Sequence, residues 1–301
     1  MENLKSKLFF PICDFACDFE EEIEIEPGLH IRKLKESDLI FDPAGLANTL
    51  KNITKYCKYG LFCFFDPYFS SQNNMRDAEQ KLLRLINSMR ILKYTHGNIN
   101  YKFELEGAQN NLKSFSHYEL DMGGEDYFYR FEKRDVEYIK RIYESISKLF
   151  GKSKNFKRII NAIKFFHSAF MINTNFPEIR FIQFVTALEC LFIIGNDNIS
   201  DRLSKRLSLF EKAANFATPK EPQFIKEVYQ MRCDIVHGGG LKYYSEKPDV
   251  FYEYAKEVIA KVLKIILLSD ELIETFSKSK EKLAKYFVRL ETLQKKGGYK
   301  F

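Results

Sequence analysis

The sequence predicts an α+β N-terminal domain followed by an all-helical bundle, so that the chain is mainly α overall. Alternating strand-like patterns are confined to the first part of the chain. From Asp135 onward, apolar residues recur at helical spacing, with Pro and Gly at the ends of the segments. A length of 301 residues is enough for two cores. We therefore expect an N-terminal domain at residues 1–134 and a helical domain at residues 135–301.

The N-terminal elements begin with a hairpin. Glu22-Ile-Glu-Ile-Glu26 alternates charged and apolar residues, and Pro27-Gly28 predicts a turn into a second strand at residues 29–34. Three further elements are a buried strand at residues 59–65, a helix at 74–92 with an Asn available as its cap, and a strand at 99–106. The polar stretch 107–124 is expected to be loop.

The C-terminal half predicts six helices, each with its own start or stop signal. They are a helix from Asp135 stopped at Gly151, one at Phe156–Phe170, one at Pro177–Ile194, one capped by Ser200, one opened by Glu221-Pro222 and ended at Gly238, and one at Pro248–Leu268. A Lys-rich tail follows the last helix.

Composition indicates a globular, cytoplasmic protein. The chain is 45% hydrophobic and 29% charged, and its 29 Phe with no Trp predict a Phe-dominated core. No apolar run approaches the roughly 20 residues of a membrane span. The run Leu8–Cys13 is too short, and too interrupted by Pro11, for a signal-peptide core. We therefore expect no contact with a membrane.

The six cysteines do not resemble a disulfide framework. Cys190 and Cys233 fall in helical apolar stretches and are most simply small buried side chains. Cys13, Cys17, Cys57 and Cys63 offer a four-thiolate zinc site as an alternative, but their spacings are poor matches to zinc-binding pairs. We expect no metal and no cofactor.

Charge is distributed unevenly along the chain. The net charge is +6, yet residues 1–40 hold ten acidic and five basic residues, so the remainder carries +11. A positive field attracts polyanions without identifying them. For any single basic cluster, a plainly solvated surface remains an equal alternative.

The segment Tyr229–Gly240 places Arg232 and His237 five residues apart, just before a glycine run. Arginine grips phosphate through a planar fork, and histidine exchanges protons near neutral pH. On a straight helix the two side chains would point about 140° apart. Either the helix ends at His237 with Gly238 in the left-handed conformation, or a second copy of the chain contributes its own pair.

Two acidic residues accompany this pair. Glu189 lies within the apolar run of its helix, where an unpaired carboxylate is costly. Its expected partner is a cation, with Arg232, Arg202 and Arg206 as candidates. Asp234, three residues before His237, either orients the imidazole or faces water. None of the other histidines has a plausible metal-ligand or nucleophile partner at readable spacing: His30, His96, His117 and His167.

The Arg232-x4-His237 spacing, followed by Gly238, resembles the signature of HEPN domains, in particular the Apea-like branch. Thr186–Phe192 matches the helix that precedes the signature in that family, and Asp201–Phe210 matches its basic helix. The similarity covers about residues 150–270, and a weaker similarity lies upstream of this range. One departure is Cys233, which stands where many members have a polar residue.

The resemblance implies a metal-independent endoribonuclease that acts as a homodimer with a composite site. His237 would act as general base or acid, and Arg232 would hold the scissile phosphate, giving 2′,3′-cyclic phosphate ends. Glu189 and Asp234 would support the pair. Possible RNA contacts are Lys242, Tyr243, Arg202 and Arg206.

The resemblance also implies a biological setting, in which a toxin degrades RNA in antiviral defence by abortive infection. An antitoxin or a phage-derived trigger is the corresponding possible partner, and the N-terminal domain would sense it or restrain the nuclease. Two alternatives stay open. One is a non-catalytic HEPN module that binds RNA, a nucleotide or a partner protein, and the other is a helical dimerisation scaffold.

Overall fold

The chain forms two compact units, Met1–Glu144 and Ser145–Phe301, in a computed structural model. The division falls inside helix α3 (Asp135–Gly151), which starts at the expected first residue of the helical half. The structure describes residues 6–13, 15–17, 21–35, 57–65, 72–93, 101–106, 111–117, 129–152, 156–172, 176–195, 197–238 and 248–296.

Unit 1 contains a six-stranded sheet in the order β3-β4-β5-β1-β6-β7, with antiparallel neighbours throughout. Its strands are β1 (Ser6–Cys13), β3 (Ile23–Glu26), β4 (Leu29–Lys33), β5 (Cys57–Phe65), β6 (Tyr101–Glu106) and β7 (Asn111–His117). The short strands β2 (Phe15–Cys17) and β8 (Tyr129–Phe131) pair in parallel as a second sheet. The predicted hairpin is present as β3 and β4, with Gly28 at φ 80° in its turn.

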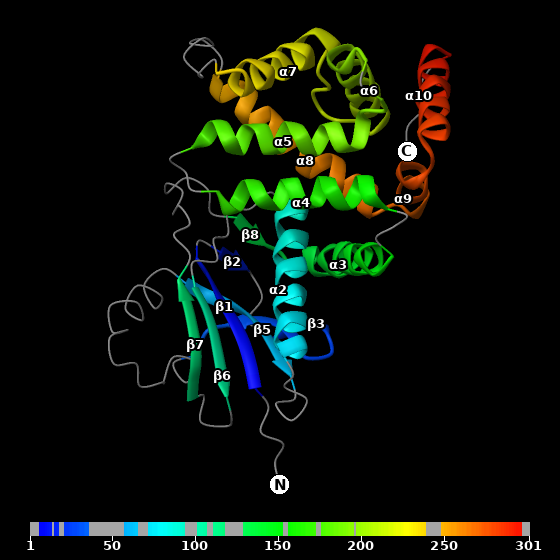
Figure 1. Cartoon of the computed structure of the whole chain (residues 1–301). Coiled ribbons are helices and arrows are strands. Elements are labelled where there is room, and N and C mark those ends of the chain that lie inside the picture. Colours follow the sequence, from blue (N-terminus) through cyan, green and yellow to red (C-terminus); the bar gives the residue numbers. More distant parts are fainter. Residues whose placement is uncertain are drawn as a thin grey trace. The chain divides into compact units, whose positions relative to one another are not determined.

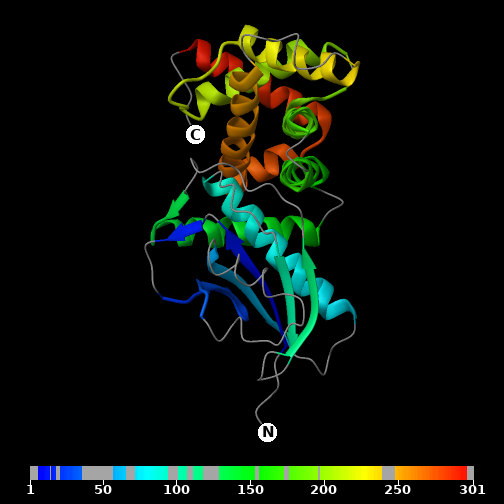
Figure 2. The same cartoon turned by 90° about the vertical axis from the view of Figure 1, so that its left-hand side faces the viewer.

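Helix α2 (Gln72–Lys93) runs across one face of the six-stranded sheet and contacts β5 and β1 (Figures 1 and 2). Its apolar stripe recurs at helical spacing, so Leu82 and Leu85 are fully buried. On the strands, Leu8, Leu29 and Leu61 are also fully buried. The core of unit 1 therefore lies between the sheet and α2.

Unit 2 is a bundle of helices. They are α4 (Lys157–Met171), α5 (Pro177–Phe192), α6 (Ile199–Ala213), α7 (Pro222–Val236), α8 (Pro248–Leu267), α9 (Asp270–Ser277) and α10 (Lys280–Lys295), together with the end of α3. Helices α4 and α5 lie side by side, and α8 crosses both (Figure 1). The expected fold class, an α+β N-terminal part followed by a helical bundle, is confirmed.

Phenylalanine dominates one part of the bundle core, as its abundance predicts. The Phe192 ring, from α5, has its centroid 5.6 Å from that of Phe210, 5.8 Å from that of Phe276 and 5.8 Å from that of Phe287. These rings come from α5, α6, α9 and α10, so the end of α5 is held by three other helices. Offset and edge-on ring pairs of this kind add stability beyond burial alone.

Three sequence expectations are wrong. The stretch 107–124 contains strand β7, because pairing of the backbone with β6 needs no apolar pattern at the edge of a sheet. The Lys-rich tail contains α9 and α10; α10 buries Leu283, Phe287 and Leu290 along one stripe despite its lysines. Ser200 does not cap α6: the N-cap is Asn198, in the left-handed conformation, and the Ser200 hydroxyl is buried with no hydrogen-bond partner.

Helix starts are better predicted where Pro provides the signal. Pro177 and Pro222 each occupy the first turn of their helices, where the missing N–H removes a donor that would otherwise lack a partner. Among the described residues, no helix combines the length and the apolar character that crossing a bilayer requires.

Replacing Phe192 by Ala should lower the free energy of unfolding by about 3–5 kcal/mol, because it leaves a cavity among three rings. Val288→Ala is the control, since Val288 is 65% exposed and should change stability by less than about 0.5 kcal/mol. Urea denaturation followed by circular dichroism measures both. Equal effects of the two substitutions would show that the ring cluster does not support the bundle.

Candidate functional site

Both residues of the predicted pair lie at the end of helix α7: Arg232 is in its last turns, and His237 directly follows its last residue, Val236. His237 is its C-cap, and the His237 N–H donates to the Cys233 carbonyl at 3.0 Å. The Gly238 N–H donates to the Ile235 carbonyl at 3.1 Å, and Gly238 has φ 90°. The predicted left-handed release at Gly238 is therefore confirmed. It leaves the His237 side chain exposed at the end of the helix.

Arg232 lies one and a half turns earlier and is held between α7 and α5. Its Nη2 lies 3.5 Å from Oε2 of Glu189, and the two side chains are 23% and 19% exposed. Its guanidinium carbon lies 6.0 Å from the centre of the Tyr229 ring. The expected cationic partner of Glu189 is thus Arg232. The Nε atom of Arg232 is buried without a hydrogen-bond partner, so only the other N–H groups of the guanidinium are available to an anion from solvent.

Tyr229 belongs to the same cluster, although the sequence did not point to it. Burial raises the pKa of the Glu189 carboxyl, while the charge of Arg232 and a hydrogen bond from Tyr229 lower it in part. The pKa of Tyr229 is raised by burial first, and then by Glu189 and Cys233. The signal that could have found Tyr229 is its place three residues before Arg232, on the same side of the helix.

Arg232 and His237 do not converge within one chain. Five residues of helix separate them by about 140° around the axis and about 7.5 Å along it. In the described part of the chain, no hydrogen bond or ion pair joins them. Arg232 presents a partly exposed guanidinium and His237 an exposed imidazole.

Asp234 is engaged with its own helix. Its Oδ1 accepts a hydrogen bond of 2.8 Å from the amide of Gln230, one turn earlier. Lys242 and Tyr243, the possible RNA contacts after the glycine run, lie outside the described residues.

Arg202 and Arg206 belong to α6, and their guanidinium groups reach the C-terminal end of α5. Their Nη1 atoms donate to the carbonyls of Ile194 at 2.9 Å and of Phe192 at 2.6 Å, and Arg158 donates to the Ile193 carbonyl at 2.9 Å. Cations at this end satisfy free carbonyls and complement the helix dipole. Burial, then the charges of Arg202 and Arg158, lower the pKa of Arg206. A guanidinium has five N–H donors, so one such bond leaves further donors.

The cysteines fall into two groups. Cys190, on α5, is partly buried, and burial followed by the neighbouring Glu189 charge raises its pKa to about 11, so it stays a thiol at neutral pH. Cys57 is the first residue of β5, and Cys63 lies six residues further along the strand. A strand of that length separates them by about 20 Å, too far for one zinc ion to bind both.

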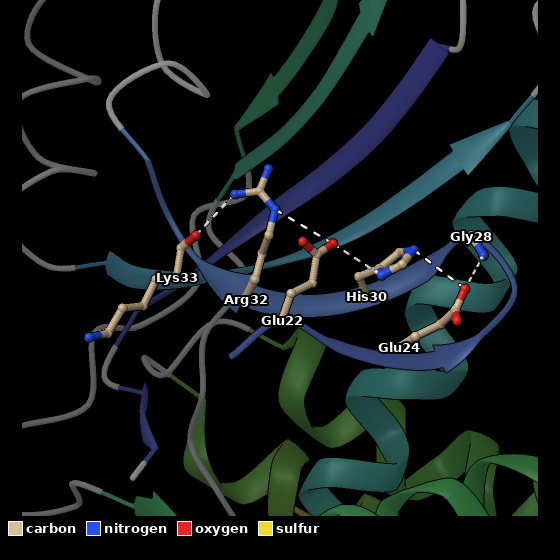
Figure 3. A network of polar contacts seen from close by, with 6 residues as sticks. All are labelled: Glu22, Glu24, Gly28, His30, Arg32 and Lys33. Carbon is tan, nitrogen blue, oxygen red and sulfur yellow. Dashed lines mark hydrogen bonds and ion pairs between the residues drawn. The ribbon is translucent and has the colours of Figure 1, made fainter. Parts of the chain in front are cut away.

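A second polar network lies on the β3–β4 hairpin of unit 1 (Figure 3). His30 Nδ1 lies 3.1 Å from a Glu22 oxygen, and His30 Nε2 lies 3.8 Å from Glu24. Arg32 Nε lies 4.0 Å from Glu22, and the Gly28 N–H donates to Glu24 at 3.2 Å. These contacts join the strand to its turn and place charges on β3, which ends the sheet and would otherwise invite further pairing. We interpret the network as structural.

Gly238→Ala should destabilise the protein by about 1–2 kcal/mol, because an L-residue resists a positive φ. Gly151→Ala is a matched control: a Cβ at either position meets no atom within 4 Å, and only Gly238 has a positive φ. Gly151→Ala, at the end of α3, should be neutral or stabilising. Chemical denaturation measures both, and an equal loss at the two positions would contradict the role assigned to Gly238.

Glu189→Gln should change how stability depends on pH. The folded pKa of Glu189 is raised above 4.5, so wild-type stability falls as pH rises from 4.5 to that folded value. The stability of Glu189→Gln relative to wild type should therefore increase across this window. Urea titrations at a series of pH values measure the difference.

Glu291→Gln provides the control of opposite sign. Hydrogen bonds from Lys205 and Lys295 lower the pKa of Glu291, so its contribution is present above pH 4.5 and is lost as pH falls through the folded pKa. Relative to wild type, this variant should lose stability as pH rises to 4.5. The same sign for both variants would refute the assignment for Glu189.

Comparisons with known proteins give no further support to the site. No protein-family model matches the chain, and neither a curated protein nor a solved structure shows a significant match to it. The site is therefore defined by its own residues: Arg232 held against Glu189 and Tyr229, and His237 exposed at the end of α7 before a left-handed Gly238.

Proposed function

We propose that this protein is a metal-independent endoribonuclease of HEPN type, with Arg232 and His237 as its catalytic residues. The observation that carries the proposal is the placement of a guanidinium, fixed by Glu189, and an exposed imidazole on the same helix, α7. Cellular RNA as the substrate would make the cytoplasm the place of action.

The reaction uses the substrate's own nucleophile. His237 of one copy takes the proton of the ribose 2′-hydroxyl, whose oxygen attacks the adjacent phosphorus. Arg232 binds the phosphate oxygens and stabilises the charge that accumulates on them. The bond to the 5′-oxygen breaks and that oxygen takes up a proton, leaving a 2′,3′-cyclic phosphate and a 5′-hydroxyl. DNA lacks the attacking hydroxyl and should not be cut.

The two groups come from different copies in this proposal. Because they diverge by about 140° on one helix, a site that uses both is more easily built across a twofold axis. The pair would then meet as Arg232 of one copy and His237 of the other. Val236, which is 48% exposed beside His237, offers apolar surface for such an interface.

A second candidate function is a non-catalytic binding module. The observation that favours it is the ion pair of Arg232, which leaves only 23% of this side chain exposed and already gives the charge a structural partner. Such a module would bind RNA, a nucleotide or a partner protein without cleaving RNA.

In either function, unit 1 would receive a signal such as an antitoxin or a phage-derived trigger, in an antiviral setting.

Arg232→Ala should reduce RNA cleavage about 10²–10³-fold, and His237→Ala about 10²–10⁴-fold, in a buffer that contains EDTA. Arg289→Ala is the matched control, since Arg289 is exposed on α10 and should leave the rate unchanged. The measurement is gel analysis of RNA with identification of cyclic-phosphate ends. Binding without cleavage by the wild type would favour the module, and cleavage that persists in both variants would refute the site.

Mixing the two inactive variants tests the composite site directly. In a mixed dimer, one site receives Arg232 from the His237→Ala copy and His237 from the Arg232→Ala copy, so activity should partly return. No recovery in a dimer shown to exchange subunits would exclude a site shared between copies.

A further inference from the structure

A cavity of about 450 Å³ lies in unit 2 between the end of α6, the segment leading into α7, and α8. This volume lies within the usual range of small-molecule sites. Phe216, Phe224 and Tyr254 line it, together with carboxylates from two helices. Neither Arg232 nor His237 lines it, so the cavity is separate from the candidate site described above.

Two aromatic rings that line the cavity are already in contact with ammonium groups of the chain's own lysines. Lys220 Nζ lies 5.1 Å from the centre of the Phe224 ring, and Lys261 Nζ lies 5.7 Å from that of Phe216. Lys261 Nζ is also 2.7 Å from a carboxylate oxygen of Glu257. Ring faces attract cations through their quadrupole, and a carboxylate adds direct charge attraction. The cavity therefore binds the chain's own ammonium groups by the two interactions that an organic cation would use.

The carboxylates on α8 form a row. Asp249, Glu253 and Glu257 all line the cavity at four-residue intervals, which place them on one side of the helix about 6 Å apart. Lys256 Nζ lies 2.8 Å from Glu253 and Lys261 Nζ lies 2.7 Å from Glu257, so Asp249 is the member of the row that has no ion pair among the described residues. Burial, then the charges of Glu257 and Asp249, raise the pKa of Glu253, as expected where negative charges crowd.

Glu211 lines the cavity from α6. Its side chain is fully buried, accepting hydrogen bonds from the Tyr254 hydroxyl at 2.5 Å and from the Lys220 N–H at 2.5 Å. These bonds fix the segment between α6 and α7 against α8, so the cavity walls are held by specific contacts. Four lining carboxylates face two lining lysines and the neighbouring Lys256, which leaves one formal negative charge in excess.

We propose that this cavity binds a linear polyamine. The ammonium groups of a polyamine are spaced by short methylene chains, and this spacing matches the interval between the α8 carboxylates. The ammonium group at one end of the polyamine replaces that of Lys261 over the face of the Phe216 ring. The exposed lysine side chain then moves into water. An extended ligand with several charges fits a row of carboxylates and rings better than a single metal ion does, because rings offer no lone pairs for coordination.

Isothermal titration calorimetry of the full chain, freed of RNA, with spermidine at low salt tests this proposal. We expect one site per chain and no binding of an uncharged diol of similar length. Asp249→Asn combined with Glu257→Gln should weaken binding about ten-fold, and Phe216→Leu about three-fold. Lys261→Gln should tighten binding about three-fold, because it removes the competing ammonium group.

Helix α9 offers matched controls for charge. Asp270→Asn combined with Glu274→Gln removes two acids outside the cavity, and Lys278→Gln breaks an ion pair of the same spacing, 3.3 Å from Glu274. These variants should bind spermidine like the wild type. Absence of binding, many weak sites, equal effects of α8 and α9 variants, or weaker binding by Lys261→Gln would each overturn the proposal. RNA cleavage is not a readout here, so the result does not depend on the proposed nuclease.

Discussion

The ion pair between Glu189 and Arg232 is the constraint on which the proposed site depends. Glu189 lies on α5 next to Leu188 and near Leu191, both buried, so its carboxylate requires a compensating cation. Arg232 supplies that cation from α7. The buried stripe of Ile225, Val228 and Met231 turns one side of α7 toward the bundle, and Arg232 lies at the edge of that stripe. His237 lies about 140° further around the helix than Arg232 and is exposed to solvent.

In the proposed function, the charge of Arg232 has two partners, which are Glu189 and the phosphate of the substrate. In the proposed nuclease, a phosphate would compete with Glu189 for the guanidinium, which has five N–H donors, although its Nε is buried. The raised pKa of Glu189 means that protonation of this carboxyl comes more readily than for an exposed one. A neutral Glu189 releases more of the positive charge to an anion. In the proposed function, Glu189 would therefore tune the charge of Arg232 as well as orient its side chain.

Charge in unit 2 is separated more than the net value of +6 suggests. Three arginines gather at the end of α5, where they bind the carbonyls of residues 192–194. The cavity beside α8 instead gathers carboxylates around aromatic rings. An RNA and a polyamine carry opposite charges, so the two proposals assign them to surfaces of opposite sign on the same bundle.

The sequence by itself determined the fold class, the hairpin at Gly28, the helix starts at Pro177 and Pro222 and the left-handed Gly238, because each depends on local backbone chemistry or on the period of a single element. It also required a cation for Glu189, since the cost of a lone buried carboxylate is independent of the fold. Only the tertiary structure decided which arginine that is, and it added Tyr229, β7 and α10. Long-range packing chooses among chemically equal partners, and a sheet edge or a docked amphipathic helix can stabilise segments whose own sequence signals are weak.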